Sequence, residues 1–105
     1  MAPREFFCPI DVTLTMINGK WKPTILYLLK RGPQRFNAFL SEMPGVSHKV
    51  LTQQLRALEH DGIVERVSGA KGVMTYRMTE LGRTLRPALT ELAAWGMKHQ
   101  KRQAR

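Results

Sequence analysis

The stretch "VSHKVLTQQLRALEHDGIVER", residues 46 to 66, carries two opposite helical faces in one segment. At about 100° per residue, Val50, Leu51 and Leu58 fall on one side, with Leu55 at its edge. Polar side chains occupy the other side at i, i+3, i+4 and i+7, namely Lys49, Thr52, Gln53 and Arg56. The segment therefore predicts a helix that is anchored by one face and presents hydrogen-bonding groups on the other.

Turn residues set the limits of this helix and place a second helix before it. Ser47 is a suitable N-cap, and Gly62 suits a left-handed stop after about Asp61. The preceding segment "RFNAFLSEM" has a helical apolar spacing, and Asn37 is its expected N-cap. Because only a few residues, "MPGVS", join the two segments, they predict a helix-turn-helix.

The remaining segments complete a mainly α (α+β) fold with one domain over residues 1–105. Two helices are expected at 10–18 and 21–31, the second with Pro23 in its first turn and Gly32 at its close. "IVERV" and "VMTYRM" flank "SGAKG" and predict a short two-stranded hairpin. A long C-terminal helix should begin at Thr79 and be kinked or split by Pro87.

Composition favours a polyanionic partner. Seventeen Lys and Arg against eight Asp and Glu give a net charge of +9, of which residues 66–105 hold +7. The apolar runs are too short for a membrane span and the start lacks a secretory signal, so a cytoplasmic protein is expected. With one cysteine and no spaced His/Cys cluster, neither a metal nor another cofactor is expected.

The polar helix face has the chemistry to read DNA. Gln can pair with adenine, Arg with guanine, and Thr with either, while Ser47 and His48 stand at a helix N-terminus that favours a phosphate. The alternative is an ordinary solvated face, which would more often show Glu to Lys pairs four residues apart. Catalysis is not indicated, because His48, His60 and His99 are scattered without a nucleophile and base pattern.

Two further basic segments flank the expected hairpin and end the chain. Arg66, Lys71 and Arg77 surround a flexible tip that suits a wing on the DNA backbone or in the minor groove; the alternative is a plain surface hairpin. Residues 98–105, "KHQKRQAR", form a basic tail that either touches DNA or is a frayed, solubilising end.

Several motifs occur together in one order: "CPID", "GKW", "IL..L", "RFNAFL", "GVSHKVLTQQLRALEHDGIVER", "TYRMTELGRTL" and a late "WG". In this combination the chain resembles the HxlR-type family of bacterial winged helix regulators, relatives of the MarR group, over roughly residues 8 to 96. It departs from many members in its short, Gly-rich wing segment "VSGAKGVM".

The resemblance implies a homodimeric transcriptional regulator that binds palindromic operators in double-stranded DNA. It assigns the major groove to Ser47, His48, Lys49, Thr52, Gln53 and Arg56, and the wing contacts to Arg66 and Lys71. Dimer contacts in the family come from the first and last helices.

A dimer is also expected on physical grounds, since one helix-turn-helix makes few contacts and two-fold symmetry doubles them. The proposed interface is apolar and comprises Ile10, Leu14, Ile17, Leu85, Leu89, Leu92 and Trp95. The alternative is that both helices pack only within their own chain. A small-molecule effector pocket lined by Trp95 and methionines is a further alternative to simple core packing.

Cys8 is a candidate sensor, because the family includes members that resemble redox and aldehyde sensors with a cysteine in this position. A nearby helix N-terminus favours a reactive thiol, whereas flanking Phe6 and Phe7 would favour an inert, buried one. Two other functions compete with that of a sequence-specific regulator: charge-driven coating of nucleic acid without specificity, and a winged helix that binds protein.

Overall fold

The described part of the chain folds into six α-helices and one β-hairpin. The computed structural model describes residues 8–103, with side chains through residue 100. The elements in order are α1 (Pro9–Ile17), α2 (Lys22–Leu29), α3 (Phe36–Glu42), α4 (His48–His60), β1 (Val64–Ser68), a 3-10 turn (Ala70–Gly72), β2 (Met74–Met78), α5 (Glu80–Arg83) and α6 (Arg86–Gln103). This order confirms the predicted mainly helical fold with a short two-stranded wing.

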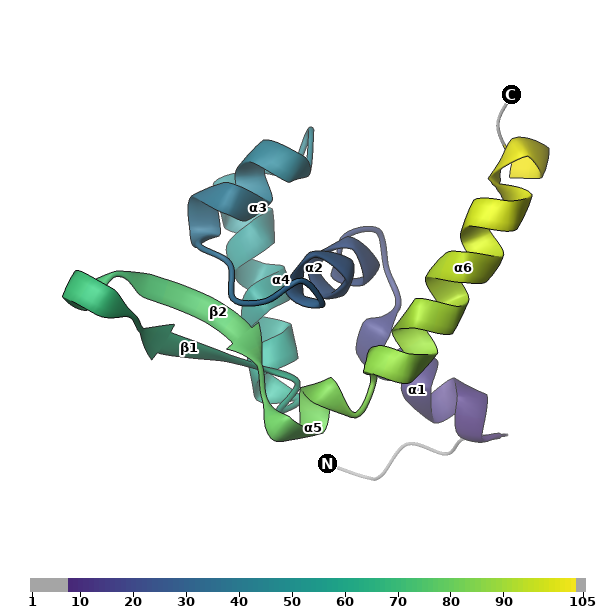
Figure 1. Cartoon of the computed structure of the whole chain (residues 1–105), viewed down its shortest axis with the longest axis horizontal. Coiled ribbons are helices and arrows are strands. Elements are labelled where there is room, and N and C mark those ends of the chain that lie inside the picture. The colour runs from purple at the N-terminus through teal and green to yellow at the C-terminus, as the bar shows by residue number, and fades with distance from the viewer. Residues whose placement is uncertain (1–7, 104–105) are drawn as a thin grey trace.

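The hairpin and the C-terminal helix lie at opposite ends of the molecule. Figure 1 shows β1 and β2 extending from one side of the central helices, while α1 and α6 lie together on the other side. The helices α2, α3 and α4 form the centre between them. The helix-turn-helix with its wing is thus separated in space from the helical pair α1 and α6.

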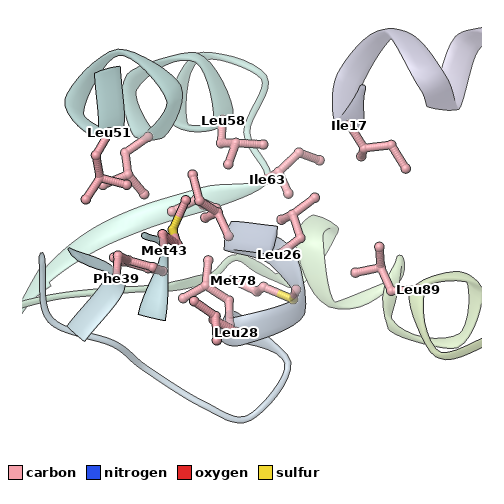
Figure 2. Close-up of a cluster of buried hydrophobic side chains, with 14 residues drawn as sticks. Ile17, Leu26, Leu28, Phe39, Met43, Leu51, Leu58, Ile63, Met78 and Leu89 are labelled. Carbon is pink, nitrogen blue, oxygen red and sulfur yellow. The ribbon is translucent and has the colours of Figure 1, made fainter. Parts of the chain in front are cut away.

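One apolar core holds these elements together. Its most deeply buried side chains come from three helices and the turn before the wing. They are Ile25, Leu26 and Leu29 of α2, Phe39 and Met43 of the α3 region, Leu51, Leu55 and Leu58 of α4, and Ile63. Figure 2 shows Ile17 of α1 and Leu89 of α6 at the edge of this cluster, where they attach the outer helices. Burial of side chains of this size is the main source of stability in a domain of this length.

The capping of α4 follows the prediction. The Ser47 side chain accepts a hydrogen bond from the Val50 backbone N–H at 3.0 Å, and Gly62 follows the helix with φ +77°. The buried face differs from the expectation in one respect: Leu55 is 1% exposed, whereas Val50 is only partly buried. The reason is that both α2 and β1 pack against α4, which turns the buried arc toward Leu55.

The expected N-cap of α3 is wrong. The helix begins at Phe36, so Asn37 is already inside it, and Arg35 occupies the cap position without a side-chain cap hydrogen bond. Just before it, the backbone of Gln34 exchanges two hydrogen bonds with Tyr76 of β2, at 2.9 and 2.8 Å. The bridge fixes the backbone at Gln34, and the helix begins two residues later, at Phe36. This tertiary pairing therefore sets the start of α3.

The hairpin is antiparallel, with Arg66 opposite Tyr76 and Glu65 opposite Arg77. Its base is held by the residues that begin α5: the Thr79 backbone N–H donates to the Ile63 carbonyl at 3.0 Å. Thr79 also caps α5 by accepting a hydrogen bond from the Gly82 N–H at 2.9 Å, so the helix begins one residue after the predicted start. The wing therefore starts from a fixed base.

The C-terminal segment is split, as the position of Pro87 predicts. The turn at Thr84 and Leu85 separates α5 from α6, and Pro87 lies in the first turn of α6. The helix α6 then continues through Gln103, so residues 98–103 of the basic tail are helical. Across the part of the chain that the structure describes, no helix has the length and hydropathy needed to cross a membrane.

Candidate nucleic-acid interface

The polar side of α4 faces away from the core. The side chains of Lys49, Gln53 and Arg56 are exposed, and that of Thr52 is partly exposed. On the opposite side, the three leucines of the helix are buried in the core. The structure thus brings together the four groove-reading residues that the sequence predicts on one surface.

These four side chains have no intramolecular hydrogen-bond or ion-pair partner among the described residues. Among the residues that the structure describes, none of Lys49, Thr52, Gln53 and Arg56 takes part in a side-chain hydrogen bond or an ion pair. Cationic and amide groups that remain free can bind phosphates and base edges without first breaking an internal contact. The surface is therefore prepared for a polyanionic partner.

Ser47 and His48, at the start of α4, also make contacts within the protein. The Ser47 hydroxyl caps the helix, as described above. The ring of His48 lies against Phe36, with ring centroids 5.4 Å apart and a tilt of 38°. Both residues remain exposed. Ser47 thus caps the start of α4, His48 contacts α3, and both side chains can still contact a phosphate.

The wing arginines are paired with carboxylates. Arg66 Nε lies 2.8 Å from Glu59 Oε1 of α4, and Arg77 Nε lies 2.8 Å from Glu65 Oε2 of the neighbouring strand. The sequence predicted both arginines beside a flexible wing tip, with Arg66 as a DNA contact, and only the three-dimensional arrangement shows their carboxylate partners. Their charge is already balanced locally.

The tip of the wing presents a cation with no such partner. Lys71 is exposed and, within the described residues, forms no ion pair. Its backbone has φ 59° and ψ 27°, a left-handed conformation that is unusual for a residue with a Cβ atom. Lys71 therefore stays a candidate for a contact with the DNA backbone, as the sequence predicts.

One candidate was missed by the sequence analysis. Arg35 is exposed at the start of α3 and lines, with Val73 and Met74, a groove of about 540 Å³ between α3 and β2. The signal that could have found it is general: the first helix of a helix-turn-helix crosses the DNA backbone. A cation at its beginning can contact a phosphate there.

A second surface, formed by α1 and α6, is apolar. Its exposed members are Ile10 at 68%, Leu14 at 47%, Leu92 at 58% and Trp95 at 65%. Two other residues of the predicted interface, Ile17 and Leu89, are buried in the chain's own core at 5% and 8%. Leu85 is partly buried and packs against that core.

A groove continues this apolar surface toward α2. It has a volume of about 560 Å³ and lies between α1, α2 and α6, with Leu14, Tyr27 and Leu92 in its walls. Tyr27, which is not part of the predicted interface, is 43% exposed, and Met97 of α6 is 61% exposed. Exposed apolar side chains in such number commonly mark an interaction site.

Cys8 is exposed and stands at the N-cap position of α1. Its carbonyl accepts a hydrogen bond from the Asp11 N–H at 3.0 Å, so the backbone is part of the first helical turn. Phe6 and Phe7, which the sequence analysis considered as covers for this thiol, lie outside the described residues. The side chain of Cys8 is therefore exposed at the start of α1.

A capped recognition helix that follows a short helix and precedes a two-stranded wing defines a winged helix-turn-helix protein. The chain belongs to the HxlR-like helix-turn-helix family, whose model matches residues 16–104. It is accordingly a helix-turn-helix transcriptional regulator, as the resemblance in its motifs predicts.

Known relatives support this assignment over most of the chain. YdeP of Bacillus subtilis (strain 168), an uncharacterized HTH-type transcriptional regulator, is 41% identical over 97 residues, covering 90% of this chain and 76% of YdeP. The structure of the redox regulator HypR in its reduced form superposes with a TM-score of 0.81 at 39% identity, covering 89% of this chain and 94% of HypR. The reduced form of the transcriptional regulator YodB from B. subtilis has a TM-score of 0.74 at 30% identity, covering 87% and 92%.

Proposed function

We propose that this regulator is a homodimer that recognises a palindromic operator in double-stranded DNA. The helix α4 enters the major groove of each half-site, and the tip of the wing contacts the adjacent backbone. Occupancy of an operator that overlaps a promoter then controls transcription. The dimer's two-fold symmetry would match two half-sites about one helical turn apart.

The unpaired polar face of α4 is the observation that carries this proposal. Lys49, Gln53 and Arg56 are exposed together and have no partner among the described residues. Gln and Arg form bidentate contacts with adenine and guanine respectively, while Lys neutralises phosphate or contacts guanine. An interface built for charge alone would not need an amide and a hydroxyl at the centre of the helix.

The first experiment measures binding to the promoter DNA beside the protein's own gene and to unrelated DNA of equal length. Roughly 150 mM salt is suitable because it weakens purely electrostatic binding. We expect the promoter fragment to bind about a thousandfold more tightly or better. Equal binding to both would favour charge-driven coating of nucleic acid, and no binding to either would favour a protein-interaction module.

The dimer part of the proposal is supported by the exposed surface of α1 and α6. The helix α6 has its last buried described side chain at Leu89, yet apolar side chains continue at Leu92 and Trp95. A monomer would leave these side chains in water, at a cost proportional to their apolar area. A second copy of the chain, related by two-fold symmetry, would cover them with the same residues.

Sedimentation measurements at micromolar concentration test the oligomeric state. We expect a mass twice that of the 12.0 kDa chain. A monomer at that concentration would contradict the homodimer and would leave the apolar surface for a different occupant.

A redox response through Cys8 is the second part of the proposed regulation. The thiol is exposed, and it belongs to the only cysteine in the sequence. Two of the similar structures support it, because HypR is described as a redox regulator and YodB has been studied after diamide treatment. With one cysteine per chain, a disulfide must join Cys8 to a second chain or to a small thiol.

Diamide tests this response, since it takes two electrons and two protons from a pair of thiols and leaves a disulfide. We expect treatment to change the operator affinity of the wild-type protein and to have no effect on Cys8→Ser. A nonreducing gel of the same samples shows whether two chains have become linked. A Cys8→Ser variant that retains the full response would contradict the role of this thiol.

A further inference from the structure

Arg66 lies on the inner face of the wing. Side chains alternate along a strand, so Arg66 shares its face with Val64, which is 2% exposed in the core. Its cross-strand neighbour Tyr76 packs against the same core. This places Arg66 toward the helical body and gives its Nε a contact of 2.8 Å with Glu59 Oε1.

The ion pair adds a polar side-chain contact between α4 and β1, which also pack against each other. Glu59 lies in the last turn of α4, and its side chain is 19% exposed. The covalent link from α4 to β1 runs through Gly62, a residue type that readily changes its backbone angles. Glu59 lies about one helical turn before Gly62, and Arg66 lies two residues after the start of β1. Their ion pair therefore restricts the angle between α4 and the wing.

The second strand of the wing is tied to the body in a different way. The backbone of Tyr76 forms two hydrogen bonds with Gln34, and its ring meets Phe39 edge to face with centroids 6.1 Å apart. Thus β2 is held by Gln34, while β1 is held by Glu59. Both contacts add to the fixed base of the wing, where Val64 and Met78 are buried and the Thr79 N–H donates to the Ile63 carbonyl.

Arg77 provides a natural comparison. Its contact with Glu65 has the same length, 2.8 Å, and the two arginines are similarly exposed at 47% for Arg66 and 49% for Arg77. Glu65 and Arg77 are direct cross-strand partners on the outer face. Their ion pair therefore connects the two strands to each other but does not connect the wing to α4.

We infer that Glu59 and Arg66 are positioning residues that hold the wing at the angle needed for α4 and Lys71 to meet one DNA duplex. Arg66 performs this task through Glu59 and does not neutralise a phosphate. The inference rests on the proposed function and revises the expected DNA contact of Arg66. It also means that Glu59, although acidic, contributes to the binding of a polyanion by positioning the wing.

The two roles of Arg66 make opposite predictions for Glu59. If the wing arginine contacts a phosphate, Glu59→Gln removes a nearby negative charge and frees Arg66, so DNA binding becomes tighter. If the pair positions the wing, Glu59→Gln lets the wing leave its binding angle, and the apparent affinity falls with the fraction of molecules that keep it.

The experiment compares Glu59→Gln, Arg66→Gln and the double variant with wild type, and uses Arg77→Gln as the charge-matched control. Operator affinity is measured as a function of salt concentration. We expect each single variant to lose roughly two- to fivefold, the range for a partly exposed ion pair, and the double variant to lose no more. The slope of log affinity against log salt should stay at the wild-type value for Arg66→Gln, as it should for Arg77→Gln.

Two results in this assay would overturn the inference: tighter binding by Glu59→Gln, or a loss of about 0.9 in the salt slope for Arg66→Gln, the value of one phosphate contact. A second measurement does not require DNA. Spin labels at Ser41→Cys on α3 and Ser68→Cys on β1, in a Cys8→Ser background diluted with unlabelled chain, report the distance between body and wing.

Glu59→Gln and Arg66→Gln should broaden this distance distribution, whereas Arg77→Gln should leave it narrow. An unchanged distribution in the first two variants would also overturn the inference. If wild type does not prefer its operator, the proposed function fails, and the distance measurement still decides whether the ion pair holds the wing.

Discussion

Gly82 packs directly against the carbonyl oxygen of Ile63, so closely that a Cβ atom at position 82 would lie 2.1 Å from it. Ile63 is the buried residue that links the recognition helix to the wing, and Gly82 belongs to α5. The absence of a side chain at position 82 therefore lets α5 close over the base of the wing. The geometry of the DNA-binding half depends on this close approach.

Gly82→Ala should consequently destabilise the fold by about 3 kcal/mol, because the obstacle is rigid backbone and cannot move aside as a flexible side chain would. Urea unfolding followed by circular dichroism measures the change. Gly96→Ala is the control: Gly96 lies in α6 with nothing of its own chain within 4 Å of the added atom. This second variant should be neutral or stabilise by up to about 1 kcal/mol. Similar losses for the two variants would contradict the role assigned to Gly82.

Gln53→Ala and Arg56→Ala should each weaken operator binding by about 1 to 3 kcal/mol while changing binding to unrelated DNA much less. The reason is that both side chains are exposed on the groove-reading face and have no internal partner among the described residues. Lys98→Ala on the distant helix α6 serves as a charge control for Arg56→Ala. Equal losses on operator and unrelated DNA would show that these side chains contribute charge and contact but no sequence readout.

Lys71→Gly should have opposite effects on stability and on DNA binding. It relieves the left-handed backbone at φ 59°, which should raise the free energy of unfolding by about 1 kcal/mol. It also removes the wing-tip charge, so the salt slope of DNA binding should fall by about 0.9.

Lys71→Gln separates the two effects, because it removes the charge and keeps the Cβ atom. This variant should show the lower salt slope without the gain in stability. A wild-type slope in both variants would mean that Lys71 is not in contact with the backbone.

Trp95→Glu should shift the protein toward monomers, because it places a charge in the middle of the apolar surface of α1 and α6. Trp95 is 65% exposed in the single chain, so its replacement should cost little in folding. Ala94→Glu is the matched control, since Ala94 is exposed and lies on another side of the same helix. Sedimentation at several concentrations measures both. A dimer that tolerates Trp95→Glu as well as Ala94→Glu would place the interface elsewhere.

Local sequence signals were sufficient for the order of the elements and for the division of α4 into a polar exposed face and an apolar buried face. Ser47 and Gly62 bound α4 through capping chemistry that operates within a few residues, and the 3.6-residue period alone separates Lys49 and Gln53 from the buried leucines. Pro87 predicted the break between α5 and α6 for the same reason, since its effect on the backbone is local. These features depend on interactions between residues close together in the sequence, so one sequence contains all the information needed to predict them.

Features that depend on distant neighbours were decided only by the tertiary structure. Asn37 was a reasonable cap by composition, but the pairing of Gln34 with Tyr76 starts the helix earlier. Arg66 was predicted as a wing contact to DNA, and only the folded chain shows Glu59 beside it. Ile17 and Leu89 share the apolar spacing of their exposed neighbours, and only packing shows that they belong to the core of their own chain. Periodicity gives the direction of a side chain on its helix, whereas the residues that it contacts come from elements far away in sequence and are set only when the chain folds.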